Sequence, residues 1–169
     1  MDIALLAHEQ FPDRAKTALG VLRYGDQTVR AVIDREHAGD RVADHVPDVQ
    51  DAPIVASMAD VPDIDALVIG IAPIGGGFEA SWRPDVRAAI ERDCDVIAGL
   101  HYFLADDEEF AALAAEHDAQ LRDLRRPPED LTVADGTAGN VDADVVLTVG
   151  TDCSSGKMTA SYELRDAAR

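Results

Sequence analysis

An apolar run, a glycine-rich loop and a helical segment follow one another near the C-terminus, and this order constrains the fold of the 169-residue chain more than any other feature. The apolar run covers residues 145–149 and the helical segment covers residues 158–168. The loop between them comprises Gly150, Thr151, Asp152, Cys153, Ser154, Ser155, Gly156, Lys157, Met158 and Thr159. A strand, a glycine-rich loop ending in Gly-Lys and a helix are typical of a phosphate-binding loop, or P-loop. We expect the backbone amides, the helix N-terminus and Lys157 to hold the phosphates of ATP or another nucleotide.

The loop departs from the common P-loop pattern in two places. Five residues separate Gly150 from Gly156, where the common motif has four. Met158 occupies the position of the usual magnesium-binding hydroxyl, and Thr159 follows it. We therefore predict Thr159 as a ligand of the Mg²⁺ ion that accompanies the nucleotide. The alternative interpretation is a strand-to-helix turn that binds no ligand.

The short segment after the loop suggests that the second domain is truncated. A nucleotide-binding domain needs further strands, whereas only residues 160–169 follow the loop. We expect a first domain over residues 1–134, a linker over 135–143 and the start of a P-loop domain over 144–169. Phosphoryl transfer also requires a positioned metal ion and nucleophile, so we do not expect this chain alone to hydrolyse a nucleotide efficiently.

Apolar β-branched runs alternate with helical stretches along the chain. We predict strands over residues 3–7, 28–34, 54–56, 66–71, 96–98, 131–133 and 145–149, and helices over residues 14–23, 83–92, 106–117 and 158–168. This alternation predicts an α/β fold, with a Rossmann-like parallel sheet covered by helices on both faces. In such a sheet the ligand lies beyond the carboxyl ends of the strands.

The charge of the chain excludes one class of partner. The net charge of −18 arises from 24 Asp and 9 Glu against 13 Arg and 2 Lys. Because these acids are scattered, they indicate a halophilic protein kept soluble in molar salt, in preference to an acidic partner-binding surface. The charge also argues against nucleic-acid binding, which needs a basic face.

Other sequence features favour a cytoplasmic protein that binds no membrane. No apolar run reaches the roughly 18 residues of a membrane span, and the N-terminus lacks the basic region of a signal peptide. Cys94 and Cys153 are isolated and form no metal or redox motif. We expect a homo-oligomer that acts on a small-molecule substrate.

Lysine scarcity draws attention to the two lysines that are present. One is Lys157 in the P-loop, and the other is Lys16 near the first predicted helix. A chain that replaces most surface lysines tends to keep those that its chemistry requires. Lys16 is therefore a candidate catalytic residue, and the alternative is a surface lysine without function.

Two loops at the carboxyl ends of predicted strands carry further candidates. Gly75, Gly76 and Gly77 follow the fourth predicted strand and allow close backbone approach to a cofactor. His101 follows the fifth and is a candidate for proton transfer, with a structural histidine as the alternative. No Gly-x-Gly-x-x-Gly follows the first strand, which disfavours a nicotinamide-dependent oxidoreductase.

Motifs along nearly the whole chain together carry a resemblance to one protein family. These motifs are Ala15-Lys16-Thr17-Ala18, Val32-Ile33-Asp34, Pro53-Ile54-Val55-Ala56-Ser57, Leu67-Val68-Ile69-Gly70-Ile71-Ala72-Pro73, Gly99-Leu100-His101, Arg126-Pro127-Pro128 and Gly150-Thr151-Asp152-Cys153 with Gly156-Lys157-Met158-Thr159. The family that they resemble is known as domain of unknown function 1611. Members have a Rossmann-like N-terminal domain followed by a P-loop domain similar to dethiobiotin synthetase. The resemblance makes Met158 a normal feature of the loop.

The family includes a D-glutamate N-acetyltransferase that uses acetyl-CoA, and the resemblance implies that activity here. His101 or a nearby carboxylate would then remove the proton of the attacking amine, and the amides of Gly75 to Gly77 would hold the tetrahedral oxyanion. Two alternatives stay open: an ATP-dependent ligase or kinase of the dethiobiotin synthetase type, and a nucleotide-binding module without chemistry of its own.

Overall fold

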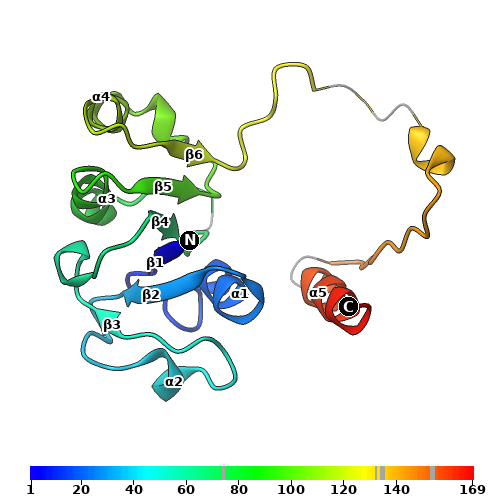
Figure 1. Cartoon of the computed structure of the whole chain (residues 1–169), viewed down its shortest axis with the longest axis horizontal. Helices are drawn as coiled ribbons and strands as arrows, with labels where there is room; N and C mark the ends of the chain where they lie inside the picture. The colour runs from blue at the N-terminus through cyan, green and yellow to red at the C-terminus, as the bar shows by residue number, and fades with distance from the viewer. Residues whose placement is uncertain (74, 132, 134–135, 153–154) are drawn as a thin grey trace. The chain divides into compact units, whose positions relative to one another are not determined.

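The computed structural model describes residues 1–169 except 74, 132, 134–135 and 153–154, and the chain divides into two compact units. The first unit is Met1–Pro127 and the second is Pro128–Arg169. Figure 1 shows the labelled strands and helices of the first unit and helix α5 of the second. The candidate site residues fall in both units, so each unit is described by itself.

The first unit is built on one six-stranded sheet with strand order β3-β2-β1-β4-β5-β6. All five strand pairs are parallel, which confirms the predicted parallel sheet. The order reverses between β1 and β4, and ligands of such sheets bind at that reversal. The strands are β1 Asp2–Leu6, β2 Thr28–Ile33, β3 Ile54–Val55, β4 Ala66–Ile69, β5 Asp95–Ala98 and β6 Leu121–Asp123.

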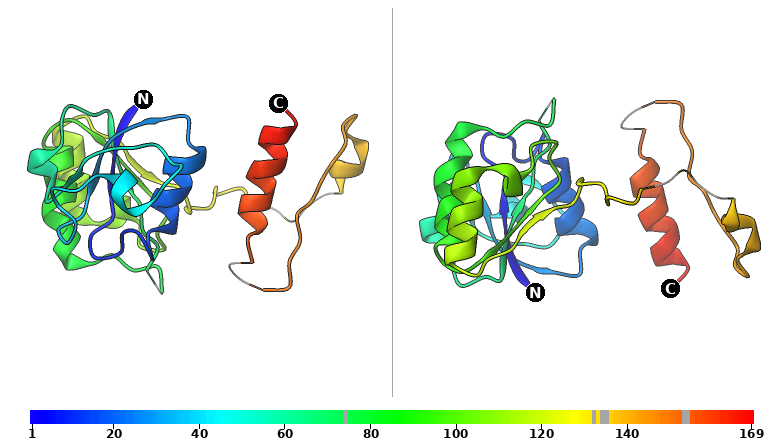
Figure 2. Two further views of the ribbon diagram at one scale, coloured as in Figure 1. Left: turned by 90° about the horizontal axis from the view of Figure 1, so that it is seen from below. Right: turned by 90° about the horizontal axis from the view of Figure 1, so that it is seen from above.

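Helices cover both faces of this sheet, as the sequence predicts. Helix α1 lies on one face and helices α3 and α4 lie on the other (Figure 2). No helix among the described residues is long and apolar enough to cross a membrane. The α-helices are α1 Lys16–Tyr24, α2 Val42–His45, α3 Arg83–Ile90, α4 Glu108–Glu116 and α5 Lys157–Ala167. The 3₁₀ turns are η1 Met58–Asp60, η2 Ala80–Trp82, η3 Leu104–Asp106 and η4 Thr137–Asn140.

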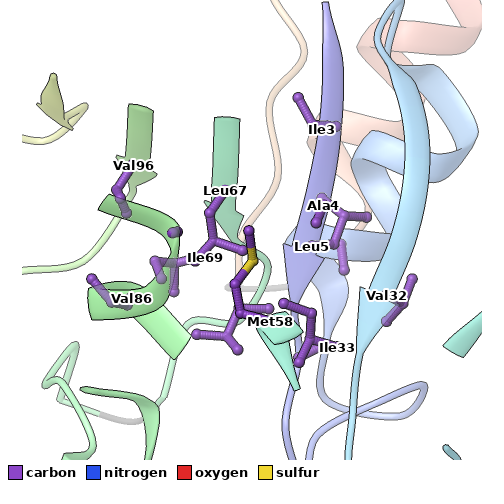
Figure 3. Packing of buried hydrophobic residues seen from close by; sticks show 14 of the residues in the cluster. Ile3, Ala4, Leu5, Val32, Ile33, Met58, Leu67, Ile69, Val86 and Val96 are labelled. Atoms are coloured by element: carbon purple, nitrogen blue, oxygen red, sulfur yellow. The ribbon is translucent and has the colours of Figure 1, made fainter. Parts of the chain in front are cut away.

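The hydrophobic core lies between the sheet and these helices. In the central strand β1, Ile3 and Leu5 are almost fully buried, and both faces of β1 are covered. Met58 from η1 and Val86 from α3 pack among the strand side chains on one face (Figure 3). Burial on both faces explains why the strands read as continuous apolar runs.

The observed strands differ from the predicted strands in three places. Strand β6 was not predicted, because Leu121–Asp123 is short and carries two charged residues. Leu131 and Val133 are in no strand, and residue 132 lies outside the described residues. Residues 145–149, predicted to lead into the P-loop, have no strand partner among the described residues, and Val146 is 78% exposed. A β-strand forms only where a neighbour takes up its backbone hydrogen bonds, so apolar composition alone does not produce one.

Candidate functional site

A hollow of about 250 Å³ lies at the carboxyl ends of β4 and β5. Its lining includes Gly75, Gly76, Leu100, His101 and Arg125. The structure thus brings together two of the predicted loops, the glycine loop after β4 and the loop after β5. Gly77 neighbours the lining residues in sequence, and Lys16 is not among them.

Gly76 is the contact point between the two loops. Its carbonyl accepts hydrogen bonds from the amides of His101 at 2.9 Å and Tyr102 at 3.2 Å. Its φ is +67°, and a Cβ at this position would lie 2.3 Å from Cδ2 of His101. Only glycine therefore allows the His101 ring to pack here. The amide of Gly76 donates to Pro73 at 2.8 Å, which leaves Gly75 and Gly77 as the candidate oxyanion donors.

His101 meets a cation at the hollow. Nη1 of Arg125 lies 3.2 Å from Nε2 of His101. A guanidinium has no acceptor, so Arg125 donates and Nε2 accepts. The imidazole is therefore neutral in this arrangement, with its proton on Nδ1. In the sequence, Arg125 belongs to the run Arg125-Arg126-Pro127-Pro128, which is compatible with cation contacts to a phosphate-bearing cofactor and equally with a turn; nothing in that run indicates a contact with His101.

An ion-pair network holds the loop that carries His101. Arg83 donates to both oxygens of Asp107 at 2.7 and 2.9 Å and to Glu109 at 2.6 Å. The hydroxyl of Tyr102, next to His101, also donates to Asp107. The hydrogen bonds from Arg83 hold the pKa of Asp107 well below its usual range, and those with Asp107 and Glu109 raise the pKa of Arg83. The network thus holds Tyr102 in place, and with it the neighbouring backbone of His101.

A second polar network is buried between the loop after β1, the turn η1 and helix α3. Nε2 of His8 donates to Asp85 at 2.9 Å, and the same carboxylate accepts from Met58 N–H at 2.7 Å and from Arg35 at 3.1 Å. Burial alone would raise the pKa of Asp85, but the hydrogen bonds from His8 and Met58 and the charge of Arg35 lower it below its ordinary value. Sequence reasoning missed Asp85 because it is one acid among many on a surface-like helix.

Asp34, which follows β2, forms hydrogen bonds within the protein. Asp34 is fully buried, accepts from the amide of Glu9 at 2.8 Å and lies 2.6 Å from Nδ1 of His37. In nucleotide-binding sheets an acid at this point holds a ribose hydroxyl. Here both carboxylate oxygens of Asp34 bind the chain itself, so Asp34 fastens the loop after β1.

Lys16 opens helix α1 and is exposed. The helix start packs against the end of β4, where the amide of Ala18 donates to the carbonyl of Gly70 at 2.7 Å. A Cβ at Gly70 would lie 2.8 Å from the Cβ of Ala18. The structure therefore places Lys16 at the carboxyl edge of the sheet but outside the lining of the hollow that contains His101.

In the second unit, Lys157 folds back over the loop that precedes α5. Its Nζ donates to the carbonyl of Asp152 at 2.5 Å and to Oγ of Ser155 at 3.1 Å. A Cβ at Gly150 would lie 2.6 Å from that Oγ and 3.2 Å from the Lys157 side chain, so Gly150 leaves room for both. Gly156 has a φ of +84° and precedes the helix. Gly150, Asp152 and Ser155 thus lie around the Lys157 side chain at the start of helix α5.

The remaining P-loop candidates differ in how far the structure describes them. Thr151 and Met158 are exposed, as is Thr159 in the first turn of α5. Cys153 and Ser154 lie outside the described residues. The described part of the chain contains no cluster of three His, Cys, Asp or Glu side chains that could hold a metal ion. Any Mg²⁺ here would therefore rely on Thr159 together with nucleotide oxygens and water.

Two family descriptions match the chain. The domain of unknown function DUF1611_N, described as a Rossmann-like domain, matches residues 35–127. The DUF1611_C P-loop domain matches residues 132–169. The boundary between the two matches agrees with the division of the structure after Pro127.

Curated relatives share one name. A D-glutamate N-acetyltransferase from Pseudoalteromonas sp is 36% identical over 103 residues, which are 61% of this chain and 30% of that protein. One from Tritonibacter scottomollicae is 39% identical over 92 residues, 54% of this chain and 27% of that protein. The chain thus matches less than a third of the length of these relatives.

Solved structures support the same relationship. A DUF1611 family protein from Anabaena variabilis superposes with a TM-score of 0.89 at 36% identity, covering 99% of this chain and 49% of that one. An amine dehydrogenase from Mycobacterium smegmatis gives a TM-score of 0.52 at 17% identity, covering 69% of this chain and 37% of that one, and shares the fold alone. The resemblance identified from sequence motifs is confirmed.

Proposed function

This chain belongs to the DUF1611 family, and we propose that it forms part of an enzyme that transfers an acetyl group from acetyl-CoA to the amino group of an acidic amino acid such as D-glutamate. The name of the curated relatives supports this activity. One structural observation carries the proposal for this chain. A neutral imidazole, His101, lines one hollow on the carboxyl edge of the sheet together with Gly75 and Gly76 of the glycine loop.

Each of these groups has a role in acyl transfer. The amine nitrogen attacks the thioester carbonyl while His101 accepts the amine proton at Nε2. The amides of Gly75 and Gly77 hold the negative oxygen of the tetrahedral intermediate. When the intermediate collapses, the carbon–sulfur bond breaks, the CoA thiolate leaves and the proton on His101 passes to it.

Replacement of His101 by alanine tests this assignment. We expect acetyl transfer to D-glutamate by His101→Ala to fall at least tenfold in kcat/KM, since a general base contributes about 10²–10⁴-fold. The control is His117→Ala, because His117 ends α4 and pairs with Asp93 on the surface. A folded His101→Ala variant that loses less than tenfold would remove His101 as the base.

We propose that the second unit binds ATP with Mg²⁺, through Lys157, the loop amides and Thr159. Mg-ATP at 100 times its dissociation constant should stabilise the folded chain by about 2.7 kcal/mol. Lys157→Ala should abolish the corresponding thermal shift, measured in molar KCl because of the charge of the chain. Lys16→Ala makes the same change in charge elsewhere and should keep the shift. An equal shift in wild type and Lys157→Ala would contradict the P-loop assignment.

An ATP-dependent ligase or kinase of the dethiobiotin synthetase type is the second candidate, and the match to the P-loop domain favours it. The two candidates differ in the ligand of the first unit. Stabilisation by CoA and acetyl-CoA supports the acetyltransferase. Stabilisation by Mg-ATP alone, without any effect of CoA compounds, supports the ligase or a nucleotide-binding module.

A further inference from the structure

The turn after β6 holds two adjacent arginines at fixed positions. The amide of Leu124 donates to the carbonyl of Ala98 at 2.8 Å, and the amide of Arg126 donates to the carbonyl of Asp123 at 3.0 Å. The Asp123 carboxylate accepts from two backbone amides of η3 at 2.9 and 3.0 Å. The turn is therefore tied both to the sheet and to the neighbouring loop, so the fold sets the position of the Arg125 backbone.

The two arginines have different partners. Arg126 pairs with Asp106 at 2.6 Å and lies 4.4 Å over the ring of Phe103. Arg125 lines the hollow instead, and its guanidinium contacts Nε2 of His101. Among the described residues no carboxylate forms an ion pair with Arg125, although the chain has 33 acidic residues against 15 Lys and Arg. The positive charge of Arg125 thus faces the hollow with a neutral imidazole as its partner.

An anion with two oxygens suits this guanidinium better than the imidazole does. Arginine presents its N–H groups in a planar fork that matches a carboxylate, and such paired hydrogen bonds are about twice as strong as neutral ones. The hollow of about 250 Å³ is smaller than the roughly 300–1,000 Å³ of sites for drug-sized ligands. An amino acid fits this volume, whereas a whole nucleotide does not.

We infer that Arg125 binds a carboxylate of the acidic acceptor and that this binding releases His101. When the guanidinium turns to the carboxylate, it stops donating to Nε2 of His101, which can then accept the amine proton. Acceptor recognition and activation of the base are thereby linked through one side chain. This inference rests on the proposed acetyltransferase function, and it assigns that function a substrate-binding residue.

The test uses glutarate, a dicarboxylate without an amine, titrated into the full chain by calorimetry in molar KCl. We expect Arg125→Gln to weaken glutarate binding about ten- to hundredfold, because a hydrogen-bonded charge is lost. Arg125→Lys keeps the charge but loses the fork and should be intermediate. The matched control is Arg122→Gln, which removes the same charge from a surface pair with Asp95 and should bind like the wild type. Fluorescence of Trp82, the single tryptophan, checks that each variant is folded.

Two results would overturn the inference. One is glutarate affinity in folded Arg125→Gln equal to that of the wild type. The other is an Arg125-dependent affinity for inorganic phosphate without one for glutarate, which would assign the residue to a phosphate of CoA.

Failure of the proposed function gives a different pattern. If glutarate binding depends on Arg125 but acetyl-CoA neither binds nor reacts, the carboxylate site stands and the acetyltransferase does not. If acetyl transfer proceeds and Arg125→Gln leaves KM for D-glutamate unchanged, the function stands and the inference fails.

Discussion

Asp85→Ala is expected to lower the free energy of unfolding of the first unit by about 3 kcal/mol. The carboxylate is buried and accepts hydrogen bonds from His8, Met58 N–H and Arg35. Alanine would leave the buried Met58 amide and the His8 ring without this acceptor. These donors come from the loop after β1, the loop after β2 and the turn η1, so the change removes a link between these three segments and helix α3.

Urea unfolding followed by the fluorescence of buried Trp82 measures this loss. The control is Asp63→Ala. The Asp63 side chain is fully exposed, and its ion pair with Arg92 is long, at 3.8 Å. Such a surface substitution should change the free energy of unfolding by no more than about 0.5 kcal/mol. Equal stability of Asp85→Ala and Asp63→Ala would mean that the buried network contributes nothing net.

The same carboxylate gives a pH dependence with a definite sign. The pKa of Asp85 in the folded chain is lowered from 3.8, so the ionised group stabilises the fold fully above about pH 4. That stability is lost as the pH falls from there through the lowered folded-state pKa. The wild type should therefore have a larger free energy of unfolding than Asp85→Asn above about pH 4, and this difference should shrink only below that pH. A difference in the free energy of unfolding that stays constant down to pH 2 would contradict the conclusion that Asp85 is ionised in the folded chain.

If the chain has the proposed acetyltransferase activity, Gly76→Ala is expected to lower that activity about 100-fold, because a displacement of about 1 Å in a reacting group has an effect of this size. A Cβ at this position would lie 2.3 Å from Cδ2 and 2.9 Å from Cγ of His101, so the ring must move away. The positive φ of +67° adds about 1–2 kcal/mol of backbone strain for an L-residue.

Gly75→Ala separates these two effects. Gly75 has a φ of +89°, but a Cβ there would meet no atom within 4 Å. Both variants carry backbone strain, and only Gly76→Ala displaces His101. The difference in kcat/KM between them therefore measures the displacement, and the ¹⁵N shifts of the His101 ring report it directly. Equal losses in the two variants would show that the packing of His101 on Gly76 is unimportant for transfer.

Sequence patterns were sufficient for the first five strands of the sheet and for the family. The central strands are apolar along their whole length because both faces are buried, and that pattern is local in the chain. The motif from Gly150 to Thr159 and the loop motif ending at His101 are also continuous in sequence, so they could be recognised without a structure. Residues 145–149 show the limit of this approach, since their apolar composition is present without a strand partner among the described residues.

The amino-acid sequence by itself determined the Rossmann-like parallel sheet, the P-loop motif and the family, because each is recognised from patterns of residues that are close together in the sequence. Only the tertiary structure decided that Arg125 joins His101 and Gly76 at one hollow, and that Asp85 anchors His8. The three hollow residues come from separate loops after β4, β5 and β6. They meet because parallel strands in register bring their carboxyl ends to the same edge of the sheet. That register depends on long-range pairing, which no local pattern specifies.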